Sequence, residues 1–233
     1  MLQHLGIFIS FLCLLFSGSI NRAYAHSDAF LERLEEHEEI DAWDALPSKD
    51  RLELLGEAAE KLRDVPYIWG GSKVGSLEQC QACRECVAKK KVPLARRLQK
   101  CRPCQQCGLD CSHFVSRLFE IVGLDFPYAS TRELRRASAS ALKRYHQLIS
   151  IPVDLKAVQA GDLILYAKHV VLVLKGYGDG RADFIHASRF RKGDRNKLGG
   201  LELERGKFLH RMRGPVKRIL RHIEFHEEPL PQS

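Results

Sequence analysis

One cysteine and two histidines are the residues of this 233-residue chain best placed to do chemistry. Cys111 follows Asp110, a residue type that caps helices, and the apolar spacing behind it predicts a helix over residues 111–122. A helix start carries partial positive charge and free N–H groups, which favour a thiolate. Downstream, His169 opens one apolar run and His186 lies near the end of another. A thiol at a helix start beside imidazoles on strands predicts a cysteine nucleophile, a histidine base and a third group that orients the base.

Six further cysteines form two triplets with the same spacing, which are Cys80, Cys83, Cys86 and Cys101, Cys104, Cys107. Residues 80–107 also hold eight basic residues and one acidic residue, with too few apolar residues for a core, so covalent or metal links are needed. An antiparallel hairpin would nest the triplets as three disulfides, and this pairing is favoured for an exported protein.

Two metal-based alternatives remain open for these cysteines. Paired Cys-x-x-Cys units also build tetrahedral zinc sites. The spacing from Cys101 to Cys111 matches a set of iron–sulfur ligands, although Ser112 stands where that pattern usually has proline. If all six insert cysteines pair with one another, Cys111 is the thiol left over.

The first 25 residues are predicted to be a signal peptide. An eleven-residue apolar run over residues 6–16 is followed by the small-residue pattern Ala23-Tyr24-Ala25. The run is shorter than the ~20 apolar residues that span a bilayer, so no transmembrane helix is expected. Removal of residues 1–25 also removes Cys13 and leaves seven cysteines, an odd number that indicates one free thiol. We therefore expect a secreted protein of the periplasm or the cell envelope.

The elements that must position these residues follow from hydrophobic periodicity. Residues 26–64 hold 13 acidic and 5 basic residues and predict two amphipathic helices, the second over residues 49–62. A further, more exposed helix is expected over residues 131–146. Short β-branched or apolar runs then predict antiparallel strands over residues 162–167, 169–175, 182–188, 200–204 and 215–225. Helices followed by a strand meander predict an α+β fold, with antiparallel strands covered by helices.

Composition excludes several classes of protein. The chain is 45% hydrophobic with a net charge of +8, which excludes wholesale disorder, collagen and a coiled-coil rod. Export and the lack of a recognition motif argue against nucleic acid as a partner. The basic insert is either a contact for anionic polymers of the envelope or a solubilising charged loop, and the sequence leaves both open.

Five short motifs occur in one order: Tyr67-x-Trp69-Gly70-Gly71, Gly108-Leu109-Asp110-Cys111-Ser112-x-Phe114-Val115, Ala160-Gly161-Asp162-Leu163-Ile164, His169-Val170, and Phe184-Ile185-His186-Ala187. This order resembles the NlpC-type family of cell-wall cysteine peptidases, a papain-like group related to CHAP domains. The resemblance implies a catalytic domain over residues 65–225 with the cysteine-rich insert at 72–107, preceded by the acidic region at 26–64 and followed by a tail at 226–233.

The resemblance also implies roles for individual residues. Cys111 would be the nucleophile, His169 the general base and His186 the orienting residue. Tyr67 would lie near the reacting group, with Asp110 and Ser112 beside the substrate. The implied substrate is peptidoglycan, cut at an amide between D-glutamate and a diamino acid, and no cofactor is implied.

Two positions depart from the family's pattern. His113 and Val171 stand where the family usually has glycine. Besides the peptidase, two other functions stay open: a zinc or iron–sulfur redox or binding module of the envelope, and a catalytically silent protein that binds the cell wall.

Overall fold

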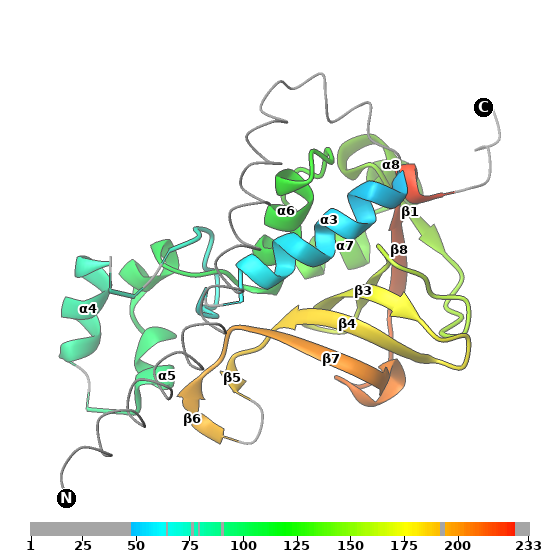
Figure 1. Ribbon diagram of the computed structural model, residues 1–233. Coiled ribbons are helices and arrows are strands. Elements are labelled where there is room, and N and C mark those ends of the chain that lie inside the picture. Colours follow the sequence, from blue (N-terminus) through cyan, green and yellow to red (C-terminus); the bar gives the residue numbers. More distant parts are fainter. Residues whose placement is uncertain are drawn as a thin grey trace, which may run out of the picture. The chain divides into compact units, whose positions relative to one another are not determined.

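Apolar runs in the second half of the chain form a six-stranded antiparallel sheet (Figure 1). The computed structural model describes residues 48–226, except 64, 76, 79, 90, 192 and 193. The expected signal peptide, the first acidic helix and all but one residue of the C-terminal tail lie outside the described residues.

The strand order in the sheet is β1-β8-β2-β3-β4-β7, and every neighbouring pair is antiparallel. The bounds are β1 (Leu148–Ile151), β2 (Leu163–Leu165), β3 (Val170–Gly176), β4 (Arg181–Ala187), β7 (Leu201–Phe208) and β8 (Arg218–His222). The α+β class and the five predicted strands are confirmed. The prediction missed β1 and a small two-stranded sheet of β5 (Phe190–Arg191) and β6 (Asp194–Leu198).

Central strands carry apolar residues at consecutive positions because both faces of the sheet are covered. All three residues of β2 and the first four of β3 are buried. Tyr166, Phe184 and Ile219 belong to one cluster of the core, with Leu209 from the short helix η2 (Leu209–Arg211). The buried Tyr166 side chain donates a hydrogen bond from its hydroxyl to the carbonyl of Leu209 at 2.7 Å, so its polar group is paired.

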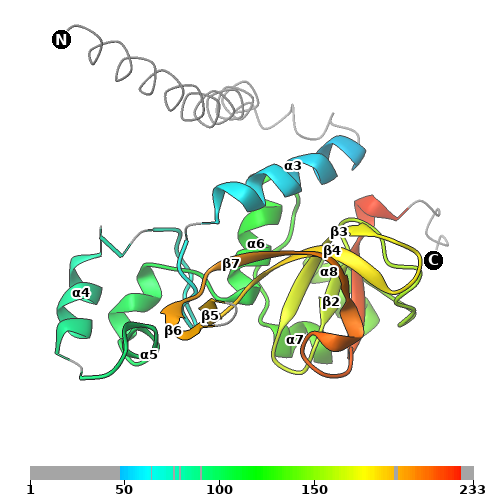
Figure 2. The same ribbon diagram turned by 60° about the horizontal axis from the view of Figure 1, so that its bottom comes forward.

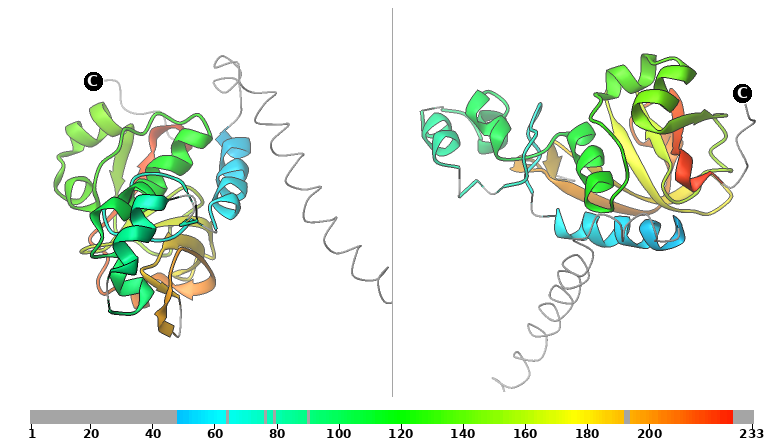
Figure 3. Two further views of the ribbon diagram at one scale, coloured as in Figure 1. Left: turned by 90° about the vertical axis from the view of Figure 1, so that its left-hand side faces the viewer. Right: turned by 90° about the horizontal axis from the view of Figure 1, so that it is seen from above.

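Helices α3 (Ser48–Lys61) and α6 (Cys111–Ile121) lie against each other, and α6 packs on β3 and β4 (Figure 3). The face of α3 that meets the core includes Leu55, Ala58 and Ala59, all fully buried. At the other end of the described chain, Glu224 in the short helix η3 (Ile223–Phe225) pairs with Arg51 at 2.6 Å, so α3 is fixed to the sheet region.

The single helix expected over residues 131–146 is wrong, because this stretch forms two helices, α7 (Thr131–Arg136) and α8 (Ala139–His146). Ala137 adopts an extended conformation with ψ 141°, and Ser138 caps α8 by accepting from the N–H of Ala141. The cap at Ser138 therefore starts a second helix within the stretch where the apolar spacing predicted one continuous helix.

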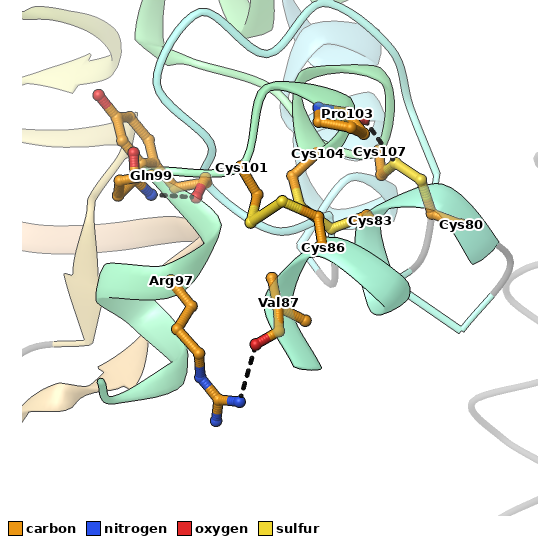
Figure 4. Close-up of a disulfide and its surroundings, with 11 residues drawn as sticks. Cys80, Cys83, Cys86, Val87, Arg97, Gln99, Cys101, Pro103, Cys104 and Cys107 are labelled. Atoms are coloured by element: carbon orange, nitrogen blue, oxygen red, sulfur yellow. Dashed lines mark hydrogen bonds between the residues drawn. A yellow bond between two sulfur atoms is a disulfide. The ribbon is translucent and has the colours of Figure 1, made fainter. Parts of the chain in front are cut away.

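Residues 80–107 form a small lobe that is held by three disulfides (Figure 4). It is built from α4 (Gln81–Ala88), α5 (Leu94–Leu98) and η1 (Arg102–Gln106). The pairs are Cys80–Cys107, Cys83–Cys104 and Cys86–Cys101, which confirms the predicted nested order. We call this segment the disulfide lobe, and Figures 1 and 2 place it beside the β5–β6 sheet.

Within the described part of the chain, no helix combines the length and the apolar character needed to cross a membrane.

Candidate active site

Cys111 is the first residue of α6, and Asp110 caps that helix as the sequence predicted. The Asp110 carboxylate accepts from the N–H of Ser112 at 3.0 Å and of His113 at 2.9 Å. Burial opposes the charged form of Asp110, but hydrogen bonds from His113 and Ser112 outweigh it and hold its pKa below the usual value. The carboxylate is therefore a fixed negative charge next to the thiol.

The Cys111 side chain is 5% exposed, and among the described residues Cys111 is the cysteine outside a disulfide. Its Sγ lies 3.8 Å from the hydroxyl of Thr131. Burial raises the pKa of the thiol, and the Asp110 charge raises it further, although Thr131 and the backbone N–H of Val170 act in the opposite direction. The expectation that the helix start would favour a thiolate is thus wrong for the free protein, because burial outweighs the N–H groups.

His169 and His186 come together from adjacent strands. The imidazole of His169 lies immediately before β3, and that of His186 lies in β4, with Nε2 of the first 3.1 Å from Nδ1 of the second. Their rings meet edge to face, with centroids 5.0 Å apart. Burial lowers the pKa of His169 well below its usual value, and the neighbouring His186 and Arg213 add to this effect. His169 is therefore a neutral imidazole at neutral pH.

A carboxylate stands behind His186. Glu202 on β7 is its direct partner across the sheet, with a carboxylate oxygen 3.9 Å from Nε2 of His186. This distance is too long for a hydrogen bond, so the carboxylate acts on the His186 ring through its negative charge. Sequence reasoning missed Glu202, because nothing in the chain order shows which β7 residue lies opposite His186.

Tyr67 is packed close to the thiol by backbone pairing between two of the sequence motifs. Its neighbour Ile68 donates to the carbonyl of Leu109 at 3.1 Å, and the N–H of Asp110 donates to the carbonyl of Gly71 at 3.0 Å. A Cβ on Gly71 would collide with the backbone at residue 108, so glycine allows this close approach.

The electrostatics of Tyr67 place it in the same site as Cys111. Burial is the largest cause that raises the pKa of its hydroxyl, and the charges of Cys111 and Asp110 raise that pKa further. The Ser112 hydroxyl donates to Asp110 at 2.9 Å, which strengthens the helix cap.

A cavity of about 420 Å³ is lined by Asp110, Cys111 and Ser112. Two exposed aromatic residues also line it, Trp69 at 59% exposed and Tyr128 at 45%. The other lining residues are polar or basic with one alanine, and they are Ser130, Thr131, Arg132, Arg135, Ala167 and Lys168. The cavity is therefore an open groove beside the buried thiol, with three cationic side chains.

His113, which departs from the family's pattern, packs against two residues that line this cavity. Its ring stacks on Tyr128 with centroids 3.8 Å apart, and its Nδ1 lies 3.2 Å from the Asp110 carboxylate. The imidazole thus holds an aromatic side chain over the helix cap. Tyr128 and Thr131 were both missed by sequence reasoning, because they reach the site through a loop and a helix start that carry no motif.

Two groups of described residues have potential metal-ligand atoms within 4.8 Å of one another, Cys80 with Cys83 and Cys107, and His186 with Glu202 and Glu204. The sulfurs of the first group are all bound in disulfides, so they do not supply the thiolates that zinc or an iron–sulfur cluster binds. The metal-based alternatives for the insert therefore do not fit this structure.

A buried cysteine at the start of a helix, packed on an antiparallel sheet that carries paired histidines, defines the papain-like class. Residues 64–218 match the family model described as the NlpC/P60 family, which is well over half of the chain. The protein belongs to the NlpC/P60 family, whose members are cysteine peptidases and related hydrolases. No curated protein and no solved structure matches the chain.

Proposed function

We propose that this protein is a cysteine endopeptidase that hydrolyses amide bonds in the stem peptides of bacterial peptidoglycan. The observation that carries the proposal is the buried Cys111 thiol, which lines an open cavity at the start of α6 and contacts the β3 backbone that adjoins His169. Membership of the NlpC/P60 family supports this chemistry.

The proposed reaction begins with two neutral groups. Nε2 of His169 is engaged with His186, so Nδ1 is the ring nitrogen left to take the proton from Cys111. Because burial disfavours both the thiolate and the imidazolium before substrate binds, the proton moves as sulfur attacks the amide carbon. The backbone N–H of Cys111 would stabilise the oxyanion. His169 then protonates the leaving amine, and water activated by His169 releases the acyl group.

His186 and Glu202 are proposed to set the tautomer of the base. A carboxylate facing Nε2 of His186 favours a proton on that nitrogen, which leaves Nδ1 as an acceptor. Because Nδ1 of His186 accepts, Nε2 of His169 must donate to it and therefore carries the proton. Nδ1 of His169 then carries the lone pair needed for catalysis. Glu202 is thus a positioning residue that acts through His186.

The walls of the cavity support a substrate that carries carboxylates. Arg132, Arg135 and Lys168 line the same cavity as Cys111, and stem peptides of peptidoglycan carry free carboxyl groups. Arg135 also donates to the carbonyl of Ala167 at 2.6 Å, which holds its guanidinium in place. We propose the bond between D-glutamate and a diamino acid as the one that is cut.

The three disulfides and the family support an enzyme that works outside the cytoplasm, on the cell wall. Export through a signal peptide at residues 1–25 is part of this proposal. Metal analysis separates it from a metal module, since the proposed enzyme needs no stoichiometric zinc or iron.

Mass spectrometry of digested muropeptides tests the proposal directly. Wild-type protein should release fragments whose masses identify the bond cut, and Cys111→Ala should release none while keeping the fold. Arg117→Ala is the matched control, because Arg117 is an exposed residue on the same helix and should keep full activity. Turnover by Cys111→Ala, or no turnover by the wild type on any muropeptide, would falsify the assignment.

A further inference from the structure

The disulfide lobe presents a dense set of positive charges. Residues 80–107 contain eight basic residues and one acidic residue. Six of the basic residues are described and exposed, and they are Arg84, Lys89, Lys91, Arg96, Lys100 and Arg102. Such a surface attracts polyanions, and its effect extends over roughly 10 Å at moderate ionic strength.

Covalent and hydrogen-bonded links keep the helices that carry these charges in fixed positions. Three disulfides join α4 and its flanks to η1 and its flanks (Figure 4). Arg97 crosses from α5 and donates to the carbonyl of Val87 at 3.1 Å. A preorganised set of cations loses little entropy on binding, so it suits a ligand better than a mobile loop would.

The lobe is joined to the rim of the catalytic cavity by two glutamines. Gln99 accepts from the N–H of Trp69 at 2.9 Å and donates to the carbonyl of Tyr67 at 3.2 Å. Gln105 donates to the carbonyl of Trp69 at 3.3 Å. Trp69 itself lines the cavity together with Cys111, so these bonds connect the lobe to the rim of that cavity, and the exposed Lys100 directly follows Gln99.

We infer that the disulfide lobe is a second binding surface for the peptidoglycan polymer, through the carboxylates of stem peptides next to the one being cut. This inference rests on the proposed function. The substrate is a polymer, so chain that leaves the cavity past Trp69 meets the lobe, whereas a separate phosphate-bearing polymer has no such connection to the site. The lobe therefore raises the affinity for intact cell wall and leaves the chemistry at Cys111 unchanged.

A variant with four fewer positive charges tests this surface. Lys89→Gln, Lys91→Gln, Lys100→Gln and Arg102→Gln are combined, which keeps Arg97 and its hydrogen bond to the carbonyl of Val87. The control combines Lys143→Gln, Arg144→Gln, Lys156→Gln and Lys207→Gln, four exposed residues outside the lobe with the same total charge. Binding to purified sacculi, stripped of phosphate polymers by hydrofluoric acid, is measured by sedimentation in a Cys111→Ala background. Cleavage of a small soluble muropeptide is measured with Cys111 present.

The lobe variant should bind stripped sacculi about tenfold or more weakly at low salt, cleave the soluble muropeptide at the wild-type rate, and differ from the control variant. Equal losses in both variants would overturn the inference, and so would an effect seen only on sacculi that keep their phosphate polymers. If the wild type cleaves no muropeptide, the proposed function fails, while the binding comparison still reports on the lobe.

Discussion

At the scale of single residues, Cys111 and His169 are both held in their neutral forms. Burial raises the pKa of the thiol and lowers that of the imidazole, so the two shifts act against an ion pair in the free protein. A neutral pair is less reactive toward oxidants and stray electrophiles than an exposed thiolate. In the proposed mechanism, the thiol becomes reactive when substrate enters and its proton is transferred in the transition state.

Alkylation of Cys111 should therefore be slow at neutral pH. We expect the rate with iodoacetamide to rise with a midpoint above the ordinary range of a cysteine thiol. Asp110→Asn keeps an oxygen that can cap α6 but removes the charge that raises the thiol pKa, so its midpoint should be lower. Mass spectrometry of the labelled peptide gives the rate at each pH. A wild-type midpoint near or below pH 7 would instead indicate a preformed ion pair with His169.

Glu202→Gln should lower kcat by about tenfold or more with little change in KM, because the amide no longer favours a proton on Nε2 of His186. Glu202→Asp, which restores a carboxylate, should recover part of the loss. Glu120→Gln is the control, since Glu120 is exposed on α6 and pairs only with Arg117 in the contacts described. Steady-state kinetics on a muropeptide measures this. An unchanged kcat, or a loss confined to KM, contradicts the proposed role.

The chemical groups themselves could be predicted from the sequence, but their neighbours could not. Asp110 caps the helix by bonding to residues no more than three positions further along the chain, so the local sequence is enough to predict the cap. Thr131 and Glu202 reach the site from elements that are 20 and 91 positions away from Cys111 in the printed sequence, and only the packing of the sheet brings them close. The direction in which the thiol pKa shifts likewise depends on burial, and no short sequence motif shows burial.

At the scale of elements, one buried ion pair gives a structural role to the motif at residues 160–164, which the proposed mechanism does not use. Asp162 is 0% exposed and accepts two hydrogen bonds from Arg221 of β8, at 2.7 and 2.9 Å. It also accepts from the N–H of Gln159 at 2.9 Å. Asp162 therefore joins the turn before β2 to the neighbouring strand β8.

Asp162→Ala should destabilise the fold by about 3–5 kcal/mol, because it leaves the Arg221 guanidinium buried without its carboxylate. Asp179→Ala is the matched control, since its ion pair with Arg181 has both side chains 46% exposed and its loss should cost far less than the loss of Asp162. Urea denaturation of both variants gives the two free energies of unfolding. Similar values for the two changes would show that the buried pair contributes no more than the exposed one.

Most elements of the sheet could be predicted because their apolar runs are continuous and bounded by glycine-rich turns. β1 was missed because it is only four residues long and begins just after a helix ends, so it carries little periodicity of its own. The boundary between α7 and α8 was missed because Ser138 forms a new cap only when the chain bends at Ala137. Local hydrogen bonds decided these boundaries, and hydrophobic periodicity alone does not detect them.

At the scale of the whole molecule, the described chain combines a family fold with a lobe that has its own covalent links. The cysteine triplets predicted the nested disulfides, since equal spacing in two facing segments leaves one nested arrangement. How the lobe joins the site could not be predicted, because Gln99 and Gln105 hold the backbone at Trp69 from about 30 residues away. The lobe is thus hydrogen-bonded to the backbone of Trp69, a residue that lines the cavity beside Cys111.

The stability of the whole fold should fall as the pH drops below about 6.5. Burial lowers the pKa of His169 and also that of His222, which lies among Phe119 and Phe225. Between the folded and unfolded pKa values the unfolded chain binds protons that the folded chain does not, so stability is greatest above the unfolded value and is lost as the pH falls toward the folded one. Each histidine contributes at most about 1.4 kcal/mol per pH unit in that window.

Urea denaturation at several pH values between 5 and 8 measures this slope. His169→Gln removes one of the two groups, so its free energy of unfolding should depend less steeply on pH than that of the wild type. His210→Gln is the control, because it makes the same substitution at an exposed histidine, and its slope is compared with that of His169→Gln. If His169→Gln keeps the full wild-type slope, then His169 binds its proton equally well in both states, and the neutral base on which the proposed chemistry depends is wrong.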